Sequence, residues 1–144
     1  MPTSTQKKSS LQRLNPETLY DPRQFAYSHI TCVPLNTIEA IVHISGQGGE
    51  NSAGELSDNF ETQCHAVFLN VQHALYAANL DWTNIAHMHL LVVDHDRQKH
   101  QIIIQYMQQY FPEQQFPACT LIPVQSLALA NMLLEIDATA YRFI

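Results

Sequence analysis

The chain has 144 residues, a length that suits one domain able to bury roughly two thirds of its extended-chain surface without disulfides. Its 7 Lys and Arg against 13 Asp and Glu give a net charge of −6, which repels a phosphate backbone and counts against a nucleic-acid partner. The 3 cysteines stand at wide, unpatterned spacings, which indicates free thiols in a reducing compartment.

The start of the chain is polar and lacks the apolar segment of a secretory signal. Apolar runs such as LLVV at 90–93 are far too short to span a bilayer. We therefore expect a cytoplasmic protein with no membrane partner. It should consist of a flexible N-terminal tail over 1–14 and a single domain over 15–144.

The first predicted elements are two strands. Phe25 and Tyr27, with β-branched residues up to Val33, indicate an early strand that stops at Pro34. The segment 38–45 then alternates apolar with more polar residues, which predicts a second strand with one buried side.

All 4 glycines fall within 46–54, which we interpret as a loop at the edge of a cleft. Apolar residues then recur at three- and four-residue steps, which predicts a helix of about 20 residues. Ser57 or Asp58 is expected to cap its start, with Glu61 completing a capping box, and Asn79 to allow a left-handed stop. The apolar stripe consists of Phe60, Cys64, Val67, Phe68, Val71, Leu75 and Ala78.

A strand is predicted over 85–93, and Asp94 or Asp96 is expected to cap a second helix after it. Two more strands, 119–124 and 132–141, give the order β, β, α, β, α, β, β without an internal repeat. This order predicts an α+β fold with one mixed sheet of five or six strands and both helices on one face. The inward side chains of the second helix are expected to be Ile103, Tyr106, Met107 and Tyr110.

The opposite face of the predicted sheet is mixed in polarity. The strand at 85–93 brings His87 and His89 to it, and the last strand brings Glu135 and Asp137. A face of this kind is too apolar for free water and too polar for a sealed core. It suits a subunit interface that contains a wet pocket, so we predict a homo-oligomer.

Several short motifs together resemble the Rid family, also called YjgF-like and formerly described as endoribonuclease L-PSP. The motifs are YSH at 27–29, SGQ at 45–47, Gln63 with VFLNV at 67–71, FPACT at 116–120 and EIDATA at 135–140. The resemblance implies a chorismate-mutase-like fold that assembles as a homotrimer, sheets inward, with a cleft between each pair of neighbouring subunits. Active members hydrolyse 2-imino and 2-enamino acids to keto acids and ammonia without a cofactor.

One position of the FPACT motif departs from the deaminating members. The resemblance implies that those proteins have an arginine after Phe-Pro-Ala, and that its planar guanidinium holds the substrate carboxylate. This chain has Cys119 at that position. A thiol with a reference pKa of about 8.5 carries no positive charge and is at best one weak donor. Loss of a buried bidentate clamp should cost roughly 3 to 5 kcal/mol of binding. The usual deaminase activity is therefore expected to be absent.

The resemblance also assigns other residues to the cleft. Tyr27 aligns with the tyrosine that lines it. Glu135 aligns with the acidic residue placed to orient water or shuttle a proton, and is the candidate catalytic residue. The backbone after Ser45, at Gly46, and at Thr120 is expected to offer N–H groups to a ligand oxygen.

The cysteine and histidines leave several interpretations open. Cys119 is either a packing residue, an unreactive thiol facing the pocket, or a nucleophile or redox sensor. His87 and His89, two positions apart on one strand, point the same way, but no third ligand is placed and no metal is expected. His29 and His43 are expected to be hydrogen-bonded interface residues that could make assembly sensitive to pH.

Three functions follow from these residues. The first is a protein that binds a small-molecule metabolite in intersubunit clefts without the usual deaminase activity. The second is an active imine or enamine deaminase whose anion contact comes from backbone N–H groups or a histidine. The third is an endoribonuclease, against which the acidic charge argues. None of these requires a cofactor.

Overall fold

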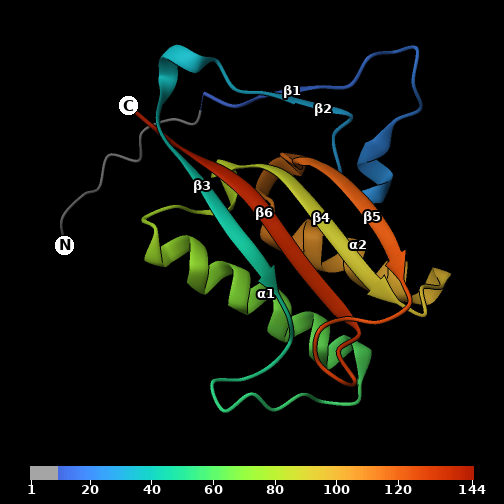
Figure 1. The fold of residues 1–144 in the computed structure, drawn as a ribbon. Coiled ribbons are helices and arrows are strands. Elements are labelled where there is room, and N and C mark those ends of the chain that lie inside the picture. The colour runs from blue at the N-terminus through green and yellow to red at the C-terminus, as the bar shows by residue number, and fades with distance from the viewer. Residues whose placement is uncertain (1–9) are drawn as a thin grey trace.

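The computed structural model describes residues 10–144, which form two sheets and two helices (Figure 1). The strands are β1 Gln12–Leu14, β2 Ile30–Cys32, β3 Ile38–Gln47, β4 Ile85–Val93, β5 Ala118–Val124 and β6 Leu134–Phe143. The α-helices are α1 Phe60–Ala77 and α2 Arg97–Tyr110. Short 3-10 turns are η1 Pro22–Phe25, η2 Leu35–Thr37, η3 Trp82–Asn84 and η4 Pro112–Gln114.

The main sheet has four strands in the order β3-β6-β4-β5, and β1 pairs with β2 in a separate two-stranded sheet. Strand β4 runs parallel to β5 and antiparallel to β6, so the main sheet is mixed. The predicted α+β fold with a mixed sheet is confirmed. The six strands, however, divide into four and two rather than forming one sheet.

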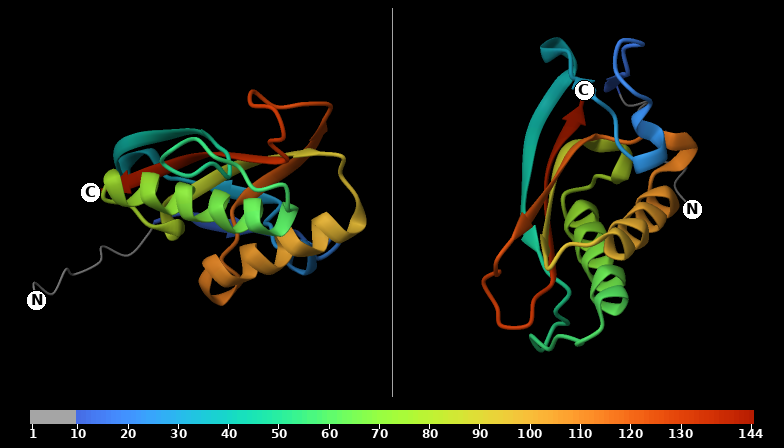
Figure 2. Two further views of the ribbon diagram at one scale, coloured as in Figure 1. Left: turned by 90° about the horizontal axis from the view of Figure 1, so that it is seen from below. Right: turned by 90° about the vertical axis from the view of Figure 1, so that its right-hand side faces the viewer.

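Both helices cover one face of the main sheet, as Figure 2 shows in its right-hand view. The face toward them is apolar, with Met88 and Val92 of β4 and Leu134 and Ile136 of β6 all fully buried. The alternate residues of these strands, such as His89, are only partly buried. The predicted division into an apolar covered face and a mixed open face is therefore confirmed.

The ends of α1 are fixed by local hydrogen bonds. Asn59, rather than the predicted Ser57 or Asp58, caps the start, because its side chain accepts from the backbone N–H of Thr62 at 2.9 Å. At the other end Asn79 adopts φ 58°, the predicted left-handed stop. Two backbone bonds complete a Schellman motif there, Asn79 N–H to Tyr76 O at 3.0 Å and Leu80 N–H to Leu75 O at 2.9 Å.

Helix α2 is capped by Asp96, one of the two predicted candidates. The Asp96 carboxylate accepts from the backbone N–H of Lys99 at 2.8 Å. The Lys99 ammonium donates to the backbone oxygens of Val93 and Asp94 at 3.1 and 2.8 Å, which ties the start of the helix to the end of β4. Within residues 10–144, no helix has the length and hydrophobicity that a membrane crossing requires.

The N-terminal part differs from the expectation. The predicted early strand is shortened to β2, because Ala26 takes φ 59° at the end of η1 and turns the chain. The N-terminal tail was expected to be flexible over 1–14. Leu11 is buried, however, and β1 pairs with β2, so ordered structure begins earlier than expected. Residues 1–9 of that tail lie outside the described residues.

Candidate functional site

A pocket of about 380 Å³ opens beside β5, which is an edge strand of the main sheet. Three parts of the chain enclose it: the segment 20–27, helix α2 and the adjacent strands β4 and β5. Its volume falls in the range of roughly 300 to 1,000 Å³ that is usual for small-molecule sites. The described residues that line it are Tyr20, Phe25, Ala26, Tyr27, Leu90, His100, Ile103, Ile104, Met107, Cys119, Thr120 and Leu121.

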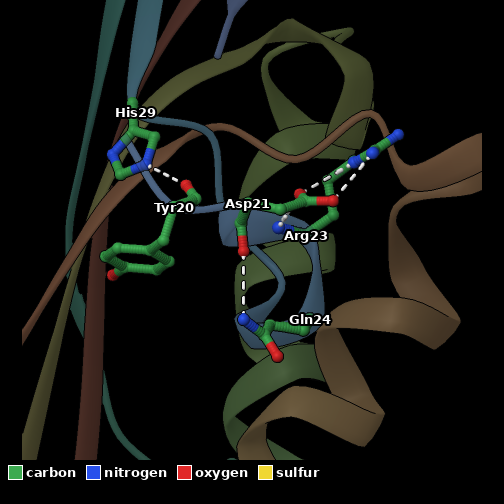
Figure 3. Close-up of polar contacts among 5 residues, drawn as sticks. All are labelled: Tyr20, Asp21, Arg23, Gln24 and His29. Atoms are coloured by element: carbon green, nitrogen blue, oxygen red, sulfur yellow. Dashed lines mark hydrogen bonds and ion pairs between the residues drawn. The ribbon is translucent and has the colours of Figure 1, made fainter. Parts of the chain in front are cut away.

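The segment 20–27 is held in place by hydrogen bonds around Asp21 (Figure 3). The Asp21 carboxylate accepts from the backbone N–H of Arg23 at 3.0 Å and from its guanidinium at 2.9 and 2.7 Å. These bonds lower the pKa of Asp21 to about 2. His29 Nε2 donates to the backbone oxygen of Tyr20 at 2.8 Å. In Figure 3 the Tyr20 ring and the Arg23 guanidinium extend to opposite sides of the segment.

Two phenols from this segment meet at the pocket. The hydroxyls of Tyr20 and Tyr27 are hydrogen-bonded to each other, and their rings meet edge to face with centroids 6.4 Å apart. Burial, and secondarily the Tyr20 hydroxyl, raises the pKa of Tyr27 to about 12. Tyr27 is therefore a neutral hydroxyl at physiological pH, able to donate or accept a hydrogen bond.

Cys119 contributes the thiol that the sequence singled out. It stands opposite Met88 in the β4–β5 register, so its side chain points to the helix-covered face, and it packs against the main core. Burial raises the pKa of the thiol to about 12, so the nucleophilic thiolate is scarce at neutral pH. The position of Cys119 and the raised pKa of its thiol favour a packing residue or an unreactive thiol at the pocket wall. They disfavour a role for Cys119 as a nucleophile.

The pocket wall carries no ionised carboxylate, ammonium or guanidinium among its described residues. Its only histidine is His100, whose pKa is lowered by burial and by the nearby His95. The His100 ring stacks on Phe25 with centroids 5.8 Å apart and planes 9° from parallel. The pocket is therefore electrically neutral near pH 7.

Glu135, the predicted catalytic acid, does not lie beside Cys119 in one protomer. It stands opposite Leu91 in the β4–β6 register, on the open face of the sheet. There it packs on Gly46, where an added Cβ would fall 1.7 Å from its Oε1. Ser45 and Gly46 are exposed near this carboxylate, at an irregularity where β3 pairs with β6. The predicted site residues thus form two groups: Tyr27, Cys119 and Thr120 at the pocket, and Ser45, Gly46 and Glu135 across the sheet.

The open face also carries a small polar cluster. His89 Nδ1 lies 2.9 Å from Asp137 Oδ1 and forms an ion pair when protonated. The pKa of His87 is lowered by burial and by His89, an effect that Asp137 opposes. His43 Nδ1 lies 3.3 Å from the Thr139 hydroxyl. Within residues 10–144, no three or more His, Cys, Asp or Glu side chains are placed so that they could hold a metal ion together.

Sequence reasoning missed Tyr20, Phe25 and His100. Tyr20 and Phe25 reach the pocket because Asp21 and Ala26 turn the chain around η1, and that turn was not predicted. His100 shares one helical face with Ile103, Ile104 and Met107, so the helical spacing was visible. Nothing in the local sequence, however, indicated that this face meets the segment 20–27.

Comparisons with known proteins agree with this architecture. A family model described as Endoribonuclease L-PSP matches residues 23–142. YyfB of Yersinia pestis, a Rid-family protein of unknown function, superposes with a TM-score of 0.85 at 29% identity, covering 92% of this chain and 98% of its own. A search of curated protein sequences gives no significant match.

Two Escherichia coli structures are also similar. TdcF with bound serine superposes with a TM-score of 0.62 at 27% identity, covering 81% of this chain and 87% of its own. The YjgF gene product superposes with a TM-score of 0.60 at 25% identity, with the same two coverages of 81% and 87%. The fold, the matching family model and these relatives lead to one conclusion: the chain belongs to the Rid (YjgF-like) family.

Proposed function

We propose that this Rid-family protein binds a small metabolite in the pocket beside Cys119 and lacks the usual hydrolysis of 2-imino and 2-enamino acids. The observation that carries the proposal is the neutrality of the pocket wall among its described residues. The resemblance to the family implies an arginine where this chain has Cys119. TdcF, a relative described with bound serine, supports a ligand of metabolite size.

We also propose that the protein is a homotrimer with ligand sites between subunits. The open face of the main sheet combines the exposed Ile41 with polar residues such as His43 and Glu135, which suits contact with another protein copy. Because Cys119 and Glu135 leave the sheet on opposite faces, a site that uses both residues needs them from different copies.

The direct test is release of ammonia and keto acid from freshly generated 2-imino acids. The wild type should show no release above the uncatalysed rate, and Cys119→Arg should create measurable activity by restoring the anion contact. A matched control is Cys32→Arg, which adds the same charge at an exposed thiol that does not line the pocket. Wild-type turnover that Cys119→Arg leaves unchanged would contradict the proposal.

The alternative is an active deaminase of altered specificity, because the carboxylate at Glu135 is retained. In that case the wild type should release ammonia, and Glu135→Gln should abolish the release while the protein stays folded. A third alternative, endoribonuclease activity, rests on the description of the family model. RNA cleavage that persists through purification and disappears in Glu135→Gln would support it against the charge of −6.

A further inference from the structure

We propose that the part of the ligand inserted beside Cys119 is an uncharged aromatic ring with a neutral hydrogen-bonding head, and not a carboxylate. This inference rests on the proposed function, because it names the ligand class of the same pocket. It follows from the shape, the charge and the hydrogen-bonding groups of the wall.

The wall is rich in aromatic rings that contact one another. Tyr20 meets Phe25 and Tyr27 edge to face with centroid distances of 6.0 and 6.4 Å, and Phe25 stacks on His100. The aliphatic side chains of Ile104 and other residues complete it. A planar ring gains from such walls through apolar burial and also through edge-to-face or stacked contacts with the rings.

Among its described residues the same wall has no charged side chain to neutralise an anion. Of the cations on adjoining segments, Arg23 pairs with Asp21 and Lys99 donates to the backbone oxygens at the end of β4, while Arg97 is exposed at the start of α2 and does not line the pocket. The pKa of Cys119 and of Tyr27 is about 12, so both keep their protons and the pocket stays neutral at pH 7. A carboxylate that enters here loses its hydration without gaining a counter-charge, which is strongly unfavourable.

The hydrogen-bonding groups fit a neutral head. The two phenols Tyr20 and Tyr27 use one proton in their mutual bond, which leaves one hydroxyl proton and free lone pairs for a ligand. The Cys119 thiol adds a weak donor at the strand edge. An amide or carbonyl on the ring satisfies these groups and costs much less to desolvate than a carboxylate.

The experiment compares phenylacetamide with phenylacetate, which share the ring and the number of heavy atoms and differ in charge. Titration of the full-length protein at pH 7, followed by NMR, should show binding of phenylacetamide with shifts at residues such as Tyr27 and Ile104. Phenylacetate should bind about tenfold more weakly or worse. Cys119→Arg should reverse the preference, whereas the matched Cys32→Arg should leave it unchanged.

A second variant guards against misfolding of Cys119→Arg. Phe25 is 41% exposed, so Phe25→Ala should fold and should weaken phenylacetamide binding several-fold by removing one ring of the wall. Equal or tighter wild-type binding of phenylacetate overturns the ligand class, and so does the absence of phenylacetamide shifts at the pocket. Ammonia release by the wild type overturns the proposed function separately, whatever the two probes show.

Discussion

Cys119 and Glu135 point to opposite faces of the same sheet, because one stands opposite Met88 and the other opposite Leu91 on the shared neighbour β4. The sulfur faces the helices and the carboxylate faces the open side. A site that joins the two would need them from two copies of the chain, which makes assembly the first property to test.

Ile41→Glu should dissociate the oligomer. Ile41 is 57% exposed on the open face, and a neighbouring copy that covers this position would bury the new carboxylate without a cation to pair with it. The wild type should sediment at about three times the protomer mass of 16.4 kDa, and the variant at a lower mass. Leu35→Glu is the matched control, since Leu35 is 86% exposed in η2, outside the sheet. A wild type that sediments as one protomer contradicts the interface.

The three thiols should differ sharply in reactivity. Cys32 is exposed, whereas the pKa of both Cys64 and Cys119 is raised to about 12, mainly by burial. Iodoacetamide at pH 8, followed by peptide mass spectrometry, should therefore label Cys32 at least tenfold faster than the others. Fast labelling of Cys119 in the folded protein would instead support the nucleophile that this geometry disfavours.

The raised thiol pKa values also predict the alkaline limit of stability. Between about pH 9 and 12 the unfolded chain loses these protons while the folded chain keeps them, so the free energy of unfolding falls as pH rises. Urea titrations at pH 8, 9 and 10 should show this decline. In Cys119→Ser the slope should be shallower, because serine does not ionise in this range. An unchanged slope would mean that Cys119 is not desolvated in the folded protein.

The sequence predicted the layers of the fold better than the site. Alternation in β4 and β6 identified the face that packs on the helices, and Asp96 identified the start of α2, since both signals are local. The pocket, in contrast, joins segments that are far apart in the chain, and only the tertiary fold brings Tyr20 to His100. The face of Glu135 followed from alternation along β6. The face of Cys119 follows from its pairing with Met88 of β4, a contact between distant strands that the local sequence did not identify.

Glycines at the end of β3 should respond differently to alanine. At Gly49 the added Cβ meets the backbone oxygen and Cα of Gln63 at 2.8 and 2.9 Å, so Gly49→Ala should destabilise the fold by about 1 to 3 kcal/mol. At Gly46 its three nearest atoms all belong to the Glu135 side chain, which can rotate away. Gly46→Ala should therefore cost less in urea unfolding while displacing the carboxylate, and equal losses at both positions would contradict this distinction.

Gln63, part of the family motif in α1, should prove structural. It is fully buried, and its Nε2 donates to Ser57 O at 2.7 Å and Asn131 O at 2.8 Å while its Oε1 accepts from Leu133 N at 2.9 Å. The side chain thus ties the start of α1 to the loop before β6.

Gln63→Leu should lower the free energy of unfolding by about 2 to 3 kcal/mol, because it keeps the volume but leaves buried backbone groups without partners. Gln72→Leu would be a poor comparison, since Gln72 is partly buried and accepts from Trp82 at 3.3 Å. The control is therefore Gln108→Leu on the exposed side of α2. Pocket binding of phenylacetamide should survive in the folded fraction of Gln63→Leu. Loss of binding without loss of stability would show instead that Gln63 acts on the ligand.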